Sequence, residues 1–472
     1  MVRFSGKLDP SVITHTWMLD ESVPSVCIRG KAIPGGLIYL AVKDPRGKLR
    51  GTLLLTGSEK SITISSEEPT FGCVQGPILP GEWTLLIHEF IGENVSQMPE
   101  NMSYEVSVEY GTPVDSQGLD QGIRAYDDEG ALVFDMDECL RDESGWYRGD
   151  FHAHTILSDG HCDLDRCREI VRQQKLDFLF LTDHNLFHPT LPREASTLFL
   201  PAVEVSTDLG HANVFCPDRW FSMEEAGATW EGILKAGLAI GGIRGINHPC
   251  MFPWKWTHGA TRLADITSLE ICCDPSWEDS PASTEQALEL FSALWNAGVH
   301  TTAVGGSDAH LLPEERNPGA QLPELFGDPM TWVYGEKLSA RGILEGVQRG
   351  HTFIERQAGL SFSINQGKTL PGERVNGPEV AVNLSVSDDS QAYFVEAVVD
   401  GKIKETHPID PGAGASFTVD LTNHRWLRLD IRREDGQFEG LINPVFTHTI
   451  DPTLFTWEDL LRETNQLDAL QS

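Results

Sequence analysis

The sequence predicts a multidomain protein of the α/β plus β class, with a central βα domain between two small β-sandwich-like domains. Three observations support this prediction. The chain of 472 residues is longer than one ordinary domain. Short β-rich segments fill both ends of the chain, whereas apolar strand-like segments alternate with helical segments between residues 148 and 358. Such alternation is typical of a sheet whose parallel strands are joined by helices.

Residues 1–112 predict a small sandwich of short strands. Segments such as GGLIYLAVKD, SITIS and SYEVSVEYG are rich in β-forming residues and are separated by Gly and Pro. They contain no cluster of reactive side chains, so we expect an accessory role in packing or binding. Residues 113–147 are polar and acidic, and we expect them to form a connector.

Residues 148–358 carry the alternating pattern. LDRCREIVRQQ, TEQALELFSALWNAG and SARGILEGVQRG predict helices, whereas LDFLFL, ITSLEI and HTTAVGG predict strands. LDFLFL is apolar without alternation, as expected of a strand that is buried on both faces. Roughly 200 residues are enough for a barrel of this class.

Residues 359–450 return to short strands, and VDGK among them predicts a tight hairpin turn. Residues 451–472 predict an amphipathic helix, at whose start Thr456 and Asp459 resemble a capping pair.

The composition excludes several classes of function. The formal net charge is −34, which disfavours nucleic-acid and anionic-membrane partners because the protein repels phosphate groups. The nine cysteines have no framework spacing and no CxxC pair, which is typical of reduced thiols and speaks against a thiolate zinc site. No apolar segment is long enough to span a membrane. We therefore expect a cytoplasmic protein that acts on a small molecule; a homo-oligomer is compatible with the sequence.

Histidines and carboxylates recur at predicted strand ends of the central domain. In FHAHTILSDG, His152 and His154 are two residues apart, so a strand projects them to the same side. Asp308 and His310 repeat this spacing. The carboxyl ends of barrel strands share one face, and polar groups are costly to bury there unless they hold a metal or one another. The candidate metal ligands defined in this way are His152, His154, Asp159, His184, Glu204, His211, His248, Asp308 and His310.

The segments that carry these residues resemble a known family. FHAHTILSDG, LTDHN, PAVEVS, GHANVF, NHP and GGSDAH, in this order, resemble the PHP (polymerase and histidinol phosphatase) metallohydrolases. LEICC and ALWNAGVHTTAVGGSDAH are similar to the branch that includes the carbaryl hydrolases. The resemblance is strong over the central domain and weak over the flanks. It implies a distorted (β/α)7 TIM-like barrel with two or three metals, preceded and followed by β domains.

The resemblance also implies how the ligands are shared among the metals. A first metal would be held by His152, His154, Glu204 and Asp308, and a second by Glu204, His211 and His248. Glu204 would then bridge the two. Asp159, His184 and His310 would hold a third metal, although Asp159 occupies a position at which some relatives have histidine.

The chemistry of this ligand set is hydrolytic. Imidazoles and carboxylates without a thiolate suit Zn, Mn or Fe, so two or three divalent ions of these elements are the predicted cofactors. A carboxylate that bridges two cations allows them to share a hydroxide, which attacks a phosphorus or carbonyl centre. The predicted catalytic residues are Asp308, Glu204 and His310, and Asp308 is also a candidate proton acceptor.

Further residues are candidates for supporting the ligands or contacting substrate. Asp183 is expected to orient a histidine, and Asn185 is a second supporting group. His161 and His188 lie next to ligand motifs and are candidates for substrate contact. Arg244 precedes His248 by four residues and could hold an anion. The tryptophans of MFPWKWTHG, Trp254 and Trp256, are expected either to cover the pocket or to pack in the core.

Three functions follow from these observations. The first is a metal-dependent phosphoesterase (EC 3.1-like) acting on a small phosphomonoester or phosphodiester. The second is a metal-dependent carboxylester, carbamate or amide hydrolase, as the carbaryl branch implies. The third is a degenerate binding module, which is disfavoured because all nine ligand positions hold competent residues.

Overall fold

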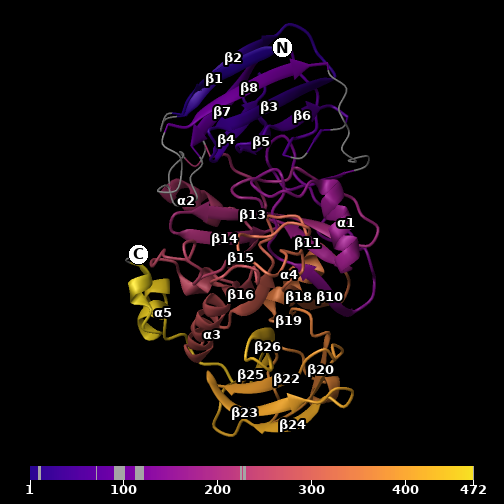
Figure 1. Cartoon of the computed structure of the whole chain (residues 1–472), viewed down its shortest axis with the longest axis vertical. Coiled ribbons are helices and arrows are strands. Elements are labelled where there is room, and N and C mark those ends of the chain that lie inside the picture. The colour runs from indigo at the N-terminus through magenta and orange to yellow at the C-terminus, as the bar shows by residue number, and fades with distance from the viewer. Residues whose placement is uncertain are drawn as a thin grey trace.

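The computed structural model describes residues 1–8, 12–67, 69–70, 72–89, 101–111, 122–223, 226 and 230–470. The predicted boundary at 112–113, the first part of the connector and the last two residues of the tail lie outside these ranges. Figure 1 shows an elongated molecule with N-terminal strands at the top, strands and helices in the middle, and C-terminal strands at the bottom. None of the helices in the described ranges combines the length and the apolar composition needed to cross a bilayer.

The N-terminal part consists of two four-stranded antiparallel sheets, with strand orders β1-β8-β3-β6 and β2-β7-β4-β5. Their facing sides enclose large apolar side chains, among which Trp17 stacks on the fully buried Trp83. The strands are β1 (Val2–Lys7), β2 (Ile13–Leu19), β3 (Ser25–Ile33), β4 (Ile38–Lys43), β5 (Leu49–Leu55), β6 (Lys60–Ser65), β7 (Gly81–Glu89) and β8 (Ser103–Tyr110). These are the short strands that the sequence predicts for a sandwich.

The described part of the predicted connector packs on the central part instead of crossing solvent. β9 (Ile123–Arg124) pairs with β12 (Thr190–Leu191). Tyr126 is buried, stacks on Trp220 and donates its hydroxyl to the carbonyl of Pro217. The central sheet also begins within this segment, since β10 spans Gly145–Asp150. β10 therefore starts within the segment that the sequence predicts as a connector.

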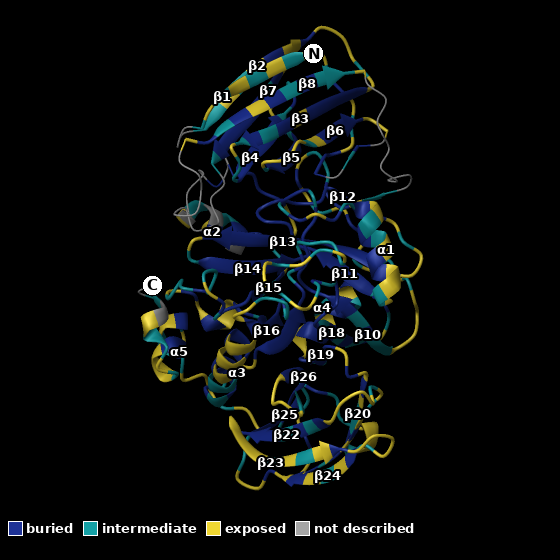
Figure 2. Ribbon diagram, viewed as in Figure 1, coloured by how far each residue is buried: buried dark blue, intermediate teal, exposed yellow. Residues whose placement is uncertain are grey.

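The central and C-terminal strands form one mixed sheet of 13 strands, in the order β17-β16-β15-β14-β13-β11-β10-β18-β19-β26-β25-β22-β23. Its central members, besides β10, are β11 (Phe178–Leu181), β13 (Leu198–Thr207), β14 (Gly210–Phe215), β15 (Ile243–Ile246), β16 (Ser268–Cys273), β17 (Thr302–Gly306), β18 (Met330–Gly335) and β19 (Thr352–Glu355). Figure 2 shows β11, β13, β14 and β16 as buried. Their near-continuous apolar runs match burial on both faces.

The sheet is not wholly parallel, contrary to the prediction. β10, β11 and β13 run parallel, as do β15, β16 and β17, but β14 is antiparallel to both β13 and β15. The reason is the short link between β13 and β14, where Thr207 pairs directly with Gly210. Two intervening residues can form a hairpin but cannot carry a crossover helix.

A continuous closed barrel is not formed by the described strands, because β17 and β10 share no ladder. The segments that follow these two strands do meet. Ala153 and Ala309 form an isolated parallel bridge, and the Asp308 amide donates to the carbonyl of His152. The predicted closed (β/α)7 barrel therefore stays a prediction, although the carboxyl ends of its first and last strands are adjacent.

Helices connect only some of the central strands. They are α1 (Leu164–Gln174), α2 (Trp230–Ala239), α3 (Ser280–Asn296) and α4 (Ala340–Gln348), followed by α5 (Trp457–Glu463) near the C-terminus. Local sequence explains their ends: the Asp163 side chain caps α1, and Lys175 ends it in the left-handed conformation. Thr456 and Asp459 form a full capping box at α5, which confirms the predicted pair.

The C-terminal part forms a second sandwich. Four of its strands continue the large sheet through the pairing of β26 with β19, while β20-β21-β24 form a separate sheet. The strands are β20 (Leu360–Ile364), β21 (Glu379–Val386), β22 (Tyr393–Val399), β23 (Lys402–Ile409), β24 (Ala415–Asp420), β25 (Trp426–Arg433) and β26 (Phe438–Phe446). Val399 pairs with Lys402, with Asp400 and Gly401 both at positive φ between them, which confirms the predicted VDGK hairpin.

Candidate functional site

All nine candidate ligands lie in one buried cluster where the central strands end. His152 and His154 follow β10, Asp159 lies in the loop after them, and His184 follows β11. Glu204 lies in β13, and His211 lies in the adjacent strand β14. His248 follows β15, and Asp308 and His310 follow β17. The sheet therefore brings together residues that are up to 158 positions apart, counting from His152 to His310.

Glu204 lies between two groups of histidines. Its Oε1 is 3.1 Å from Nε2 of His152, 3.2 Å from Nδ1 of His211 and 3.5 Å from Nε2 of His248. Its Oε2 is 2.6 Å from Nδ1 of His184. The two oxygens thus face different imidazoles, which is the arrangement that a bridging carboxylate needs.

Asp308 is the second carboxylate of the cluster. Its Oδ1 is 2.9 Å from Nε2 of His154 and 3.1 Å from Nε2 of His152. Its Oδ2 accepts a hydrogen bond from the Cys273 thiol at 3.5 Å. Asp308 and His248 have positive φ values of 50° and 26°, a conformation that is rare for residues other than glycine and is often found at functional sites.

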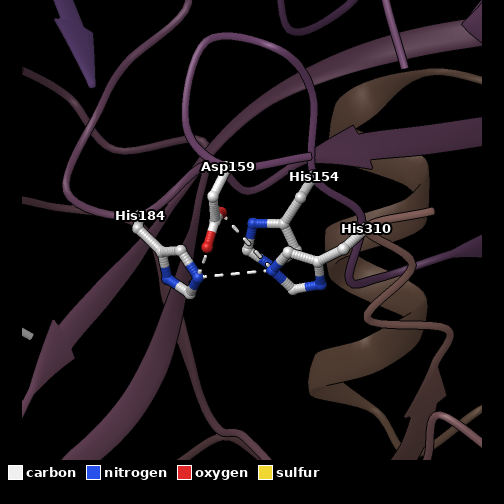
Figure 3. Close-up of side chains that lie close together, drawn as sticks. All are labelled: His154, Asp159, His184 and His310. Carbon is white, nitrogen blue, oxygen red and sulfur yellow. Dashed lines mark hydrogen bonds and ion pairs between the residues drawn. The ribbon is translucent and has the colours of Figure 1, made fainter. Parts of the chain in front are cut away.

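Asp159, His184 and His310 form the third group, and His154 joins them (Figure 3). Oδ1 of Asp159 is 3.6 Å from Nε2 of His184 and 3.5 Å from Nε2 of His310. The ring of His154 stacks on that of His310 at 4.0 Å. The sequence assigns His154 to the first metal alone, whereas the structure places it within range of two ligand groups.

The electrostatics of the cluster favour charged carboxylates, whereas the histidines divide into two groups. Burial lowers the pKa of His154 and His211, but the neighbouring carboxylates outweigh burial and raise the pKa of His152, His184 and His310. Burial raises the pKa of Glu204, but His152, His211 and His184 outweigh it and hold this pKa well below its ordinary value. The pKa of Asp308 is lowered in the same way, against burial, by His152, His154 and His310. Burial, with the neighbouring His310 and His184, lowers the pKa of His154 to about 4. Deprotonated groups of both kinds can donate lone pairs to a cation.

The cluster fits divalent metal ions. Several buried atoms make no hydrogen bond within the described part of the chain, namely Nδ1 of His154, Oδ1 of Asp159 and Nδ1 of His248. Leaving such atoms unpaired costs about 1–3 kcal/mol each. Groups of three or four donors lie within 4.8 Å of one another, and their nitrogen and oxygen atoms suit Zn, Mn or Fe.

Two supporting residues were missed by the sequence reasoning. Glu270 of β16 lies 3.1 Å from Nδ1 of His152 and accepts the His248 amide at 2.7 Å. Asn247 donates to Oε1 of Glu204 at 2.7 Å. Glu270 is a carboxylate in the apolar strand SLEICC, the same signal that identified Glu204, so the sequence did contain evidence for it.

Asp183 forms hydrogen bonds to the loop that precedes Asp159, rather than to one of the predicted ligands. Its Oδ1 accepts the amides of Thr155 and Ser158, and its Oδ2 lies 2.5 Å from Nε2 of His188. The histidine that Asp183 contacts is therefore His188, which is not one of the nine candidate ligands. His188 itself is buried against Asp183 and does not line the cavity described below.

The other predicted residues have separate positions. Asn185 exchanges two hydrogen bonds with the Ser206 backbone, at 2.9 and 3.0 Å, and so joins the ends of β11 and β13. His161 is exposed and pairs with Glu315 at 2.7 Å. Arg244 lies early in β15, paired with Val214, away from the carboxyl ends of the strands. The structure therefore does not support Arg244 as an anion clamp.

A cavity of about 190 Å³ lies over the cluster. Its lining residues are Asp159, His184, His211, His248, Met251, Trp254, Asp274, Trp277, Asp308, His310, Leu311, Asn317 and Glu324. No lysine or arginine is found among the described residues that line it. Trp254 is thus a wall of the cavity, whereas Trp256 packs in the core.

Asp274 has an unusual environment in this cavity. Burial and the nearby charge of Glu324 raise the pKa of Asp274 to about 7. Its Oδ1 accepts hydrogen bonds from the amide and hydroxyl of Ser276. Its Oδ2 accepts a hydrogen bond from Nδ2 of Asn317 at 3.5 Å.

Comparisons with known proteins identify no family. No protein-family model and no curated protein matches the sequence. Among solved structures, the chain is similar to a two-domain protein from Bacteroides vulgatus ATCC 8482 that contains a predicted PHP-like metal-dependent phosphoesterase. The identity is 14% and the TM-score 0.38, over 68% of this chain and 98% of that chain. It is also similar to an engineered protein, at 13% identity and a TM-score of 0.15, over 39% and 49% of the two chains. At these TM-scores neither similarity establishes a shared fold.

Proposed function

We propose that the chain is a metal-dependent hydrolase of the PHP kind that acts on a small molecule. The observation that carries this proposal is the buried cluster around Glu204, in which imidazoles and carboxylates converge and several donor atoms lack hydrogen-bond partners. The order of the ligand segments along the chain also supports a PHP-like domain. The adjacency of Ala153 and Ala309 supports a distorted barrel.

The ligands divide into three sets in this proposal. His152, His154, Glu204 and Asp308 would hold one ion; Glu204, His211 and His248 a second; Asp159, His184 and His310, with His154, a third. Divalent ions bound here supply activation of water as a nucleophile and stabilisation of developing negative charge.

The chain's own residues orient these ligands and move protons. Glu270 fixes the ring of His152 through Nδ1, and Asn247 holds Oε1 of Glu204. Asp308 has a lowered pKa, which makes it a better ligand than proton acceptor. Asp274 lines the cavity, and burial and Glu324 raise its pKa to about 7, so it would donate a proton to a leaving group near neutral pH.

The lining of the cavity favours a neutral scissile group, such as a carboxylic ester, carbamate or amide. Met251, Trp254, Trp277 and Leu311 supply apolar walls, and Asp274 and Glu324 add negative charge. A phosphoester usually requires cationic side chains around its oxygens, and the described lining contains none. The phosphoesterase prediction remains a second candidate because three cations in the cluster would themselves neutralise a phosphoryl group.

The experiment that tests this proposal measures metal content and hydrolysis together. Purified protein is loaded with Zn²⁺, Mn²⁺ or Fe²⁺ and assayed on aryl esters, aryl carbamates, phosphomonoesters and phosphodiesters. We expect at least two ions per chain and metal-dependent turnover of one of these classes.

The matched variants are Glu204→Gln and, as a control, Glu434→Gln, which changes an exposed carboxylate of the C-terminal part. Glu204→Gln should lose bound metal and lower kcat/KM by more than about 100-fold, beyond the usual effect of removing a partner of a ligand. Glu434→Gln should change neither quantity. Fewer than two ions per chain, or turnover that survives chelation, would contradict the proposal.

A further inference from the structure

A second cavity lies between the N-terminal sandwich and the loop that follows β10. Its volume is about 510 Å³, within the range of small-molecule sites, which often occur between domains. One wall comes from β5, β6 and the turn between them, and the other from residues 156–161. A hydrogen bond of 3.0 Å from the Leu54 amide to the Leu157 carbonyl holds the two walls together.

Asp159 connects this cavity to the metal-binding cluster. Its side chain lines both the second cavity and the cavity over the cluster. Asp159 is therefore a wall residue common to the two cavities, and a molecule that occupied both would contact it. His161, which was expected to contact substrate, lines this second cavity and not the first.

Lys60 is the cation of the second cavity. This half-buried residue begins β6, and its ammonium donates to the carbonyl of Ser158. Within the described ranges, no carboxylate lies within 4.0 Å of it, whereas the nearby Glu315 is paired with His161 and Asp159 faces His184 and His310. Burial lowers the pKa of Lys60 to about 8, although the charges of Asp159 and Asp183 oppose this shift. A partly buried ammonium with no carboxylate in direct contact within the described ranges would be stabilised by an anionic ligand.

The rest of the lining contains apolar, hydroxyl and acidic groups, and the acidic ones are Glu59, Asp159 and Glu315. Leu53, Ile62, Ile156 and Leu157 form an apolar surface. Thr56 and Ser58, whose hydroxyls lie 3.1 Å apart, line the cavity near Lys60. The lining thus suits an apolar body that ends in a group with several acceptor oxygens.

We propose that the second cavity binds the part of the substrate remote from the scissile bond, and that this part is an apolar stem ending in an anionic oxygen group, a carboxylate or a phosphate, paired with Lys60. This inference rests on the proposed function only for the identity of the ligand as substrate. It makes the N-terminal sandwich a specificity-determining part of the site. Lys60 is a binding residue in this arrangement and takes no part in the chemical step.

The test is a binding measurement by isothermal titration calorimetry on the full chain, first metal-free and then metal-loaded. The probes are 3-phenylpropionate, 2-phenylethyl phosphate and the neutral 3-phenylpropanamide. In the metal-free protein, where no cation competes for the anionic group, we expect at least one anionic probe to bind about tenfold or more tightly than the amide, as one charge-assisted hydrogen bond would give. Which anionic probe binds more tightly distinguishes carboxylate from phosphate.

Three variants decide the role of Lys60. Lys60→Gln keeps a donor for the Ser158 carbonyl but removes the charge, and it should abolish the preference for anionic probes. Lys48→Met, at an exposed lysine of the same sandwich that pairs with Glu129, should preserve it. Ser58→Trp, at an exposed position on the cavity wall, should weaken all three probes even if Lys60→Gln does not fold.

Equal affinity for the three probes in the wild type would overturn the proposal, as would a preference that persists in Lys60→Gln or binding that is unchanged in Ser58→Trp. The outcome is separable from the proposed function. If the protein binds the probes through Lys60 but hydrolyses none of the tested esters, the second cavity is still a binding site and the proposed hydrolase function is wrong.

Discussion

At the scale of the residue, the protein places two carboxyl groups of opposite character around one cavity. Asp308 faces imidazoles, which outweigh burial and lower its pKa. Asp274 lines the same cavity, but its neighbour is the carboxylate of Glu324, and burial together with that charge raises the pKa of Asp274 to about 7. Environments that separate the pKa values of two acids in this way also separate their roles, which in the proposed function are metal ligand for Asp308 and proton donor for Asp274.

The raised pKa of Asp274 predicts a pH dependence of stability in the metal-free protein. An unfolded Asp has a pKa of about 3.9, so the folded state holds an extra proton between about pH 4 and 7, and stability falls as the pH rises through this range. Asp274→Asn removes this titration. Between pH 5 and 7.5 the wild type should lose about 2–3 kcal/mol of unfolding free energy that the variant keeps.

Urea denaturation of both proteins in the presence of a chelator measures this difference. Ser276→Ala provides a control with the opposite effect on the pKa of Asp274, because it removes the hydroxyl hydrogen bond that favours the ionised form and keeps the one from the backbone amide. Identical pH profiles for the wild type and Asp274→Asn would show that Asp274 is ionised in the folded state.

At the scale of the element, side chains join the edge of β17 to the strands beside it. Asn443 of β26 accepts the amide of Ala303 at 2.8 Å and donates to the carbonyls of Ala303 and Thr352. Thr331 of β18 similarly accepts the Gly305 amide and donates to its carbonyl. These hydrogen bonds satisfy backbone groups of β17 on the side that has no neighbouring strand in the described part of the sheet. They therefore fix the position of the strand that precedes Asp308.

Replacing Asn443 with Ala should therefore destabilise the protein by about 1–3 kcal/mol, because it leaves the buried amide of Ala303 without its side-chain acceptor. The carbonyl of Ala303 keeps the hydrogen bond from the Thr352 hydroxyl. The measurement is chemical denaturation monitored by circular dichroism. Asn383→Ala, which changes an exposed asparagine on β21, should cost less than about 0.5 kcal/mol. Similar losses in the two variants would mean that the Asn443 contacts are not what stabilises β17.

At the scale of the whole molecule, the N-terminal, central and C-terminal parts contact one another directly. β19 and β26 join the central and C-terminal parts through one ladder. The N-terminal sandwich contacts the loop of Asp159 through Leu157 and Ser158. α5 returns to the central part, where the fully buried Trp457 donates from Nε1 to the carbonyl of Trp256.

The docking of α5 can be tested with two aromatic residues that are two positions apart. Trp457→Ala should destabilise the protein by about 3–5 kcal/mol, since it removes a large buried ring. Phe455→Ala should cost less than about 0.5 kcal/mol, because Phe455 is 65% exposed. Thermal and urea unfolding measure both effects. A small loss for Trp457→Ala would show that the C-terminal helix contributes little to the stability of the whole chain.

The sequence by itself determined the features that depend on a few neighbouring residues. The capping box of α5, the VDGK hairpin and the burial of LDFLFL follow from short patterns, and all are present. Strand ends also identified the nine candidate ligands, because polar residues after apolar strands must find partners at the same edge of the sheet. The pairing of β14 was missed, since strand direction depends on link length more than on composition.

Only the tertiary structure decided which of these residues touch one another. In the structure, His154 lies between two ligand groups and Asp183 contacts His188. Arg244 does not line the cavity over the cluster, and Lys60 of the N-terminal sandwich lies next to the loop of Asp159. These contacts join residues that are far apart along the chain, and side-chain periodicity carries no information about them. The physical reason is that the local sequence pattern determines on which face of a strand or helix a side chain lies. The packing of sheets and loops determines which residues that face contacts.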